Sequence, residues 1–174
     1  MQTFGQRLIN AAKLDVATYE EVEADSSALP QAMVAVVLAS IAAGIGTTSG
    51  FSVVELVVDS LGALVAWFIW ALLTYAIGTK LLAQPQTKAD LGQMLRTIGF
   101  ASAPGMLRVL GVVPVVGNLL VLAASLWMLA AMVVAVRQAL DYTSTGRALA
   151  VCLVGFVVLV VTSAVLGGLL LFTS

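Results

Sequence analysis

The sequence predicts an all-α fold: a polytopic membrane helical bundle of five transmembrane helices with an amino-terminal cytoplasmic amphipathic helix. Of the 174 residues, 61% are hydrophobic and 10% are charged, and the mean hydropathy is +1.08. These values lie far from the composition of soluble domains. The charges cluster in the first 25 residues, and beyond them several charge-free stretches reach the roughly 20 residues that a membrane-spanning helix needs.

The composition also excludes several classes of function. It is too apolar for a disordered chain or for a basic nucleic-acid binder, so we expect no nucleic-acid partner. Cys152 is the single cysteine and histidine is absent, which removes a disulfide framework, a cysteine zinc site and the commonest general base. The sequence contains no phosphate-binding loop and no pairing of nucleophile and base. We therefore expect no enzyme activity, no metal and no cofactor.

Residues 1–29 form an amino-terminal cytoplasmic segment that is amphipathic and acidic. It has no apolar core like that of a cleavable signal peptide. Phe4, Leu8 and Ala11 recur at helical spacing, which predicts a helix lying in the plane of the lipid headgroups. Thr18 and Glu21 have the spacing of a capping box, so a second helix is predicted to begin at Thr18.

The membrane domain is predicted over residues 30–174. Its first two spans are expected at about 30–48 and 51–82. Ser26 or Ser27 is expected to cap the first, and Pro30 is tolerated in an opening turn. The second span is long enough to carry Glu55 and Asp59 in its first turns.

The third span, 91–113, is the least regular. Its charge-free part between Arg96 and Arg108 is too short to cross unaided, and Pro104 and Gly105 interrupt it. Both arginines are expected to extend toward opposite interfaces and lengthen the span. A re-entrant pair of half-helices is the alternative.

Two further spans complete the bundle, at about 115–137 and 148–172. Pro114 lies at the predicted reversal that opens the fourth span. Small residues in the first and last spans allow close helix contacts and self-association: Ala39, Ala43, Gly44, Gly167 and Gly168.

The distribution of basic residues supports five crossings. Lys and Arg near span ends favour the cytoplasmic side. With five spans, Arg108 alone falls outside, and the other seven of the 8 basic residues share the face of the amino terminus. We therefore expect a prokaryotic cytoplasmic (plasma) membrane protein with its amino terminus in the cytoplasm and its carboxyl terminus outside. A re-entrant third segment would move Arg137 and Arg147 outside.

Three groups of residues are candidates for function. Glu55, Asp59 and Arg108 are predicted near one interface, where they form either a transport pathway or a structural ion pair. Interrupted helices line substrate sites in transporters, but they also kink or reverse a chain. Pro104, Gly105 and Pro114 are the predicted helix breaks. An acidic cluster offers a docking surface for a partner and lacks the spacing of a calcium loop: Glu20, Glu21, Glu23 and Asp25.

Three segments carry a family resemblance. GFASAPGML at 99–107, a later span with Trp127, and AVRQALDYTSTGRAL at 135–149 resemble the Yip-domain family, the Ypt/Rab-interacting multi-pass membrane proteins, in its bacterial branch. The resemblance implies a five-helix membrane domain without an established catalytic activity. The chain lacks the long amino-terminal region and the Asp-Leu-Tyr-Gly-Pro motif of eukaryotic members, so binding of Rab-type GTPases is not implied.

Three functional hypotheses follow. The first is a non-enzymatic organising or accessory protein that contacts the lipid bilayer, other membrane proteins or a second copy of itself. The second is a small-solute or ion permease or channel. The third is an accessory subunit of a larger membrane complex.

Overall fold

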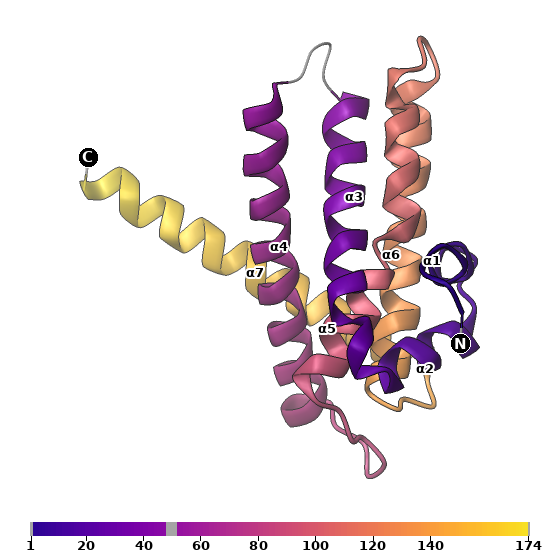
Figure 1. Ribbon diagram of the computed structural model, residues 1–174. Helices are drawn as coiled ribbons and strands as arrows, with labels where there is room; N and C mark the ends of the chain where they lie inside the picture. The colour runs from indigo at the N-terminus through magenta and orange to yellow at the C-terminus, as the bar shows by residue number, and fades with distance from the viewer. Residues whose placement is uncertain (1, 48–51, 174) are drawn as a thin grey trace.

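The computed structural model describes residues 2–47 and 52–173, without the side chains of residues 47 and 166–173. Within those residues the chain is helical and has no strand. Long helices stand side by side, the two amino-terminal helices pack against one end of the bundle, and the last helix leaves it at an angle (Figure 1).

The amino-terminal segment forms α1 (Phe4–Ala12), α2 (Val16–Ala24) and the short η1 (Ser26–Ala28). The prediction that α2 begins at Thr18 is wrong. Asp15 caps the helix by accepting a hydrogen bond from the Thr18 amide. Thr18 therefore lies within the first turn of α2, where its hydroxyl donates to the same carboxylate at 2.6 Å.

Four helices are long and apolar enough to cross a membrane, among the residues described. They are the candidate spans Ser26–Gly46, Val53–Leu81, Gly117–Ala139 and Thr145–Val165, which correspond to predicted spans one, two, four and five. These spans are formed mainly by α3 (Leu29–Thr47), α4 (Val53–Ala76) continued by η2 (Ile77–Leu81), α6 (Gly117–Ala139) and α7 (Thr145–Thr173).

The first two spans begin differently from each other. Asp25 accepts a hydrogen bond from the Ser27 amide and so caps the turn that leads into α3, with Pro30 in the opening turn. Ser52 and Glu55 form a capping box at the start of α4. The predicted start of the second span at residue 51 lies outside the described residues.

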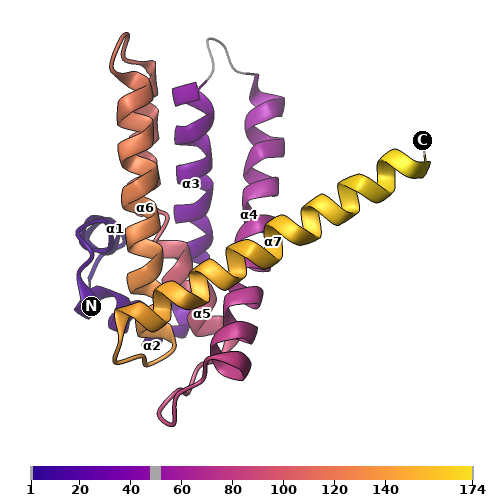
Figure 2. The same cartoon turned by 180° about the vertical axis from the view of Figure 1, so that it is seen from behind.

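Residues 91–113 do not form one regular helix. α5 (Leu91–Phe100) is followed by η3 (Ala103–Val112), a 3-10 helix with Pro104 in its first turn. The 10 residues of α5 and the 10 of η3 cover about 15 Å and about 20 Å, because a 3-10 helix rises about 2.0 Å per residue against about 1.5 Å in an α-helix. The turn after η3 lies at the same end of the bundle as the end of α3 (Figures 1 and 2).

η3 packs very closely along α3, and glycine permits this contact. A Cβ atom on Gly46 would overlap the carbonyl oxygen of Arg108, and one on Gly111 would overlap the carbonyl oxygen of Gly46. Closer to the start of α3, Gly105 lies against Ala39 and Gly99 lies against Ala32. These contacts advance along both segments, so α5 and η3 run parallel to α3.

The amino-terminal helices share a core with the bundle. Tyr19 and Val22 of α2 are fully buried in one cluster with Phe100 of α5. Phe4 and Leu8 of α1 pack against this cluster, and the rings of Phe4 and Phe100 meet edge to face at 6.3 Å. The apolar face predicted for α1 is therefore directed at the protein.

The last helix leaves the bundle. Buried residues at its start, Ala148 and Val151, belong to a core cluster with α4, α5 and α6. Further along, every residue from 157 to 165 is exposed, and the helix projects away from the body (Figure 2). Gly167 and Gly168, which are predicted to support helix packing, lie in the part of α7 for which only the helical backbone is described.

Candidate functional site

A cavity of about 470 Å³ lies between α3, α4, the α5–η3 segment and α6. It is open to the surroundings and not a sealed void. Two of the residues singled out in the sequence, Asp59 and Arg108, line it together with the hydroxyl-bearing Ser40 and Ser102. Polar groups from three separate segments, α3, α4 and the α5–η3 segment, thus converge on one space.

The Arg108 side chain runs into the bundle. Its carbonyl oxygen lies beside Gly46, yet its Nη2 donates a hydrogen bond to the carbonyl oxygen of Ala39 at 3.3 Å. Ala39 is seven positions before Gly46, about 10 Å along α3 at about 1.5 Å per residue. The Nε of Arg108 donates to the carbonyl oxygen of Gly105, also at 3.3 Å. These two carbonyl groups hold the guanidinium inside the bundle, so the expectation that Arg108 extends outward is wrong.

The predicted cluster of Glu55, Asp59 and Arg108 forms in part. Asp59 and Arg108 border the same cavity. Among the residues described, neither carboxylate lies within the 4.0 Å ion-pair distance of Arg108, since the ion pairs found there both involve Arg7. Glu55 is exposed and accepts a hydrogen bond from the Ser52 amide at 3.1 Å. Its role there is to cap α4.

The part of the cavity farther from Asp59 is apolar. Trp67 and Trp70 of α4 and Met132 of α6 line it there, whereas the sulfur of Met128 lies beside Gly105, close to the Arg108 guanidinium. The indole nitrogen of Trp67 donates to the carbonyl oxygen of Leu95 at 3.1 Å, and that of Trp70 contacts the sulfur of Met132 at 3.3 Å. Both indoles therefore have partners, and only their apolar faces remain for the cavity.

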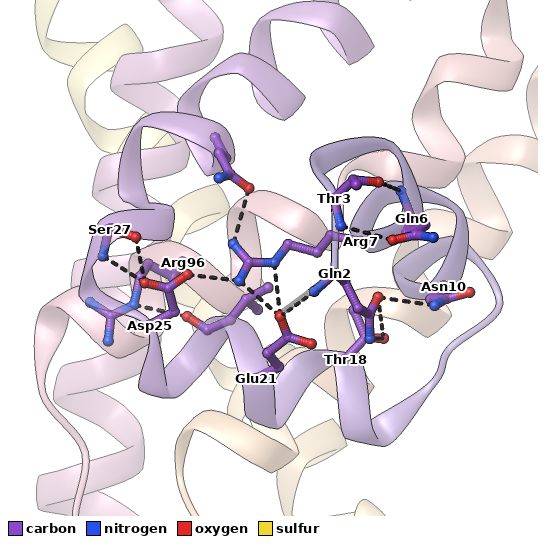
Figure 3. Close-up of polar contacts among 12 residues, drawn as sticks. Gln2, Thr3, Gln6, Arg7, Asn10, Thr18, Glu21, Asp25, Ser27 and Arg96 are labelled. Atoms are coloured by element: carbon purple, nitrogen blue, oxygen red, sulfur yellow. Dashed lines mark hydrogen bonds and ion pairs between the residues drawn. The ribbon is translucent and has the colours of Figure 1, made fainter.

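Two of the four acids of the predicted docking surface are paired with a buried arginine of the same protein (Figure 3). Arg7, 2% exposed, pairs with Glu21 at 2.9 Å and with Asp25 at 2.7 Å. Hydrogen bonds from Arg7 lower the pKa of Glu21, and hydrogen bonds from Ser27 and then Arg7 lower the pKa of Asp25. These two carboxylates fasten α1 to α2.

The other two acids face a second cavity, of about 310 Å³. Glu20 accepts a hydrogen bond from Gln138 of α6, and Glu23 accepts one from Gln93 of α5, each at 3.1 Å. Burial, followed by the charge of Asp141, raises the pKa of Glu23 to about 7. This cavity lies between α2, the end of α6 and the turn that follows α6.

Sequence reasoning missed the roles of Arg7 and Arg96. Arg96 is 8% exposed and donates to the carbonyl oxygens of Val22 and Glu23, at the end of α2. A cation at a helix carboxyl terminus is favoured by the unpaired carbonyls there. The spacing of these residues, more than 70 positions apart, carries no signal that pairs them.

The helix breaks fall at two junctions. Pro104 and Gly105 open η3 directly after α5, and Pro114 lies in the reversal between η3 and α6. Val115 in that reversal has a positive φ of 71°. No group of three or more His, Cys, Asp or Glu residues able to hold a metal ion occurs within residues 2–47 and 52–173.

Comparison with known proteins agrees with the resemblance seen in the sequence. No curated protein and no solved structure matches the chain. The Yip1 domain matches residues 16–165, a range that begins with α2 and ends within α7. It includes the cavity, both helix breaks and the four candidate membrane helices apart from the last turns of α7. The match covers most of the chain, and the protein therefore belongs to the Yip1 domain family.

Proposed function

We propose that this protein is a non-enzymatic organising or accessory component of a prokaryotic plasma membrane, acting through contacts with other membrane proteins. The observation that carries the proposal is the course of α7. Phe156 and Val157 are 59% and 58% exposed, and Val161 is 56% exposed. A helix that leaves its own bundle and presents apolar side chains all round is suited to packing against a neighbouring membrane helix.

We further propose five crossings, with the amino terminus in the cytoplasm and the carboxyl terminus outside. The combined length of α5 and η3, about 35 Å, exceeds the roughly 30 Å of a hydrocarbon core, which supports a third crossing. The positions of Arg137 and Arg147 support the orientation, because basic residues near span ends favour the cytoplasm. α1 would then lie at the cytoplasmic headgroups, its polar side outward.

Native-nanodisc extraction tests the role. An affinity-tagged protein taken directly from its membrane is expected to carry a second protein at fixed stoichiometry in an intact-mass measurement. Val157→Trp combined with Val161→Trp, one turn apart on α7, is expected to abolish that stoichiometry. The matched control, Val57→Trp with Leu61→Trp on exposed α4, leaves it unchanged. A monomer carrying lipid alone would contradict the proposal.

The acidic docking surface is proposed in a narrower form, centred on Glu20 and Glu23. These carboxylates border the second cavity, whereas Glu21 and Asp25 are occupied by Arg7. Reversing the charge at Glu20 is expected to reduce recovery of a basic cytoplasmic partner. Unchanged recovery would remove this surface from the account.

A small-solute or ion permease is the second candidate. The convergence of Asp59, Arg108, Ser40 and Ser102 on one cavity favours it, because polar groups within membrane segments commonly mark substrate pathways. Flux in proteoliposomes that falls on Asp59→Asn but not on Glu55→Gln would support a pathway. Equal fluxes in wild type and in empty vesicles would count against it.

A further inference from the structure

The cavity between α3, α4, η3 and α6 is polar at one end and apolar at the other. Asp59 lies in the second turn of α4, near the end of the bundle where α4 begins. Trp67 and Trp70 line the cavity further along the same helix, with Trp70 about 16 Å from Asp59 at about 1.5 Å per residue. Such a gradient matches an amphiphile with its headgroup toward the membrane surface and its chains toward the middle.

The polar end presents two opposite charges that do not neutralise each other. The guanidinium of Arg108 is held by carbonyl oxygens through Nε and Nη2, and no described residue accepts from its Nη1. All buried side-chain nitrogen and oxygen atoms of the described residues have partners, so the unpartnered Nη1 is not buried, and Arg108 lines the cavity. The Asp59 carboxylate makes no hydrogen bond to any described residue, and it remains available to a donor.

Charges inside a membrane segment are costly unless they meet a counter-charge or water. A ligand that carries both an anionic and a cationic group satisfies the two residues together. Arginine suits a phosphate because its N–H groups match the phosphate oxygens. A carboxylate suits an ammonium group, which has three donors and no acceptor.

We propose that this cavity binds a phospholipid with a zwitterionic aminoalkyl-phosphate headgroup, the phosphate at Arg108 and the ammonium at Asp59. The start of an acyl chain lies along the apolar faces of Trp67 and Trp70 and the flexible side chains of Met128 and Met132, which adapt to irregular shapes. The volume of about 470 Å³ falls in the range of about 300–1,000 Å³ typical of ligand sites, and the remaining chain leaves through the open side. The inference goes beyond the proposed role and does not depend on α7.

The test is a lipid competition in nanodiscs containing equal parts of phosphatidylethanolamine and phosphatidylglycerol. Lipids retained after transfer to detergent are counted by intact-mass measurement. Wild type is expected to retain phosphatidylethanolamine about tenfold over phosphatidylglycerol, since a hydrogen bond between charged groups is worth at least that ratio. Equal retention of the two lipids, or retention of neither, would overturn the proposal.

Two variants separate the roles of the charges. Asp59→Asn is expected to retain lipid but to lose the preference for ethanolamine, because only the ammonium contact is removed. Arg108→Gln is expected to lower retention of both lipids about tenfold, through loss of the phosphate contact. Glu55→Gln, four residues from Asp59 and outside the cavity lining, is the control and leaves both quantities unchanged.

The lipid-binding proposal can be tested even if Arg108→Gln does not fold. Asp59 accepts no hydrogen bond from any described residue, so its neutral isostere preserves the fold, and a wild-type preference in Asp59→Asn would by itself overturn the assignment. Soluble glycerophosphoethanolamine distinguishes a lipid from a free solute. If glycerophosphoethanolamine competes as strongly as the intact lipid, the cavity binds a soluble solute, and the proposal of a bound phospholipid is overturned.

Discussion

At the scale of single residues, buried arginines organise the protein. Arg7 and Arg96 are 2% and 8% exposed, and Arg108 is drawn into the bundle by the carbonyls of Ala39 and Gly105. The guanidinium of Arg7 is directed at carboxylates, and that of Arg96 at carbonyls at the end of α2, which lack partners within the helix. The cost of burying the charge is met by hydrogen bonds that join segments distant in the sequence.

Arg7→Ala is expected to lower the free energy of unfolding by about 2 kcal/mol, the worth of a hydrogen bond between charged groups. The pKa values of Glu21 and Asp25 are lowered in the folded state, so their stabilising contribution is present above their ordinary pKa values and is lost as pH falls through the folded ones. The difference between wild type and Arg7→Ala in detergent melts should thus be largest near pH 7 and shrink below pH about 4. A constant difference at all pH values would contradict the ion-pair explanation.

Glu23 has the opposite dependence on pH. Its folded-state pKa of about 7 lies above the ordinary value of 4.5, so the folded protein binds more protons between these values and loses stability as pH rises through them. Glu23→Gln keeps the acceptor for Gln93 and removes the charge. Its melting temperature is expected to match wild type at pH 4 and to exceed it at pH 8. Equal melting temperatures at pH 8 would show that ionisation of the Glu23 carboxyl group does not destabilise the folded protein.

At the scale of elements, the charge-free stretches predicted the four long helices well. Hydrophobicity and charge spacing act locally, and helix ends such as the Ser52–Glu55 box follow from neighbouring residues. The geometry of 91–113 was not predictable in the same way. Whether residues after Pro104 form α or 3-10 helix depends on contact with Gly46 and Ala39 of another helix, which no local pattern records.

The close contact between η3 and α3 leads to a prediction with a matched control. Gly46→Ala would place a methyl group on the backbone of Arg108, and such overpacking is expected to cost at least about 1–3 kcal/mol. Gly62→Ala in α4 meets no atom within 4 Å and is expected to be neutral or to stabilise by up to about 1 kcal/mol. Melting of both variants in one detergent measures the difference. A stable Gly46→Ala would contradict the close approach.

At the scale of the whole molecule, the family, the all-helical fold and the membrane character were predictable from sequence. They depend on composition and on motifs that extend over most of the chain. The convergence of Asp59 and Arg108 was predicted in part, because both lie near one end of their spans. The absence of an ion pair between them and the inward course of Arg108 depend on carbonyl groups of α3, which sequence patterns do not pair.

Five crossings of the membrane are the central proposal for this protein, and single-cysteine labelling tests them directly. Cys152, the one native cysteine, is first replaced by Ser. Gln86→Cys, Val115→Cys and Ser144→Cys then report the three turns that follow α4, η3 and α6, and Val115 is fully exposed in its turn. With intact cells and a membrane-impermeant maleimide, only Val115→Cys should be labelled, whereas all three should react after lysis. Labelling of Ser144→Cys together with protection of Val115→Cys in intact cells would place residues 91–113 in a re-entrant segment and contradict the five-crossing account.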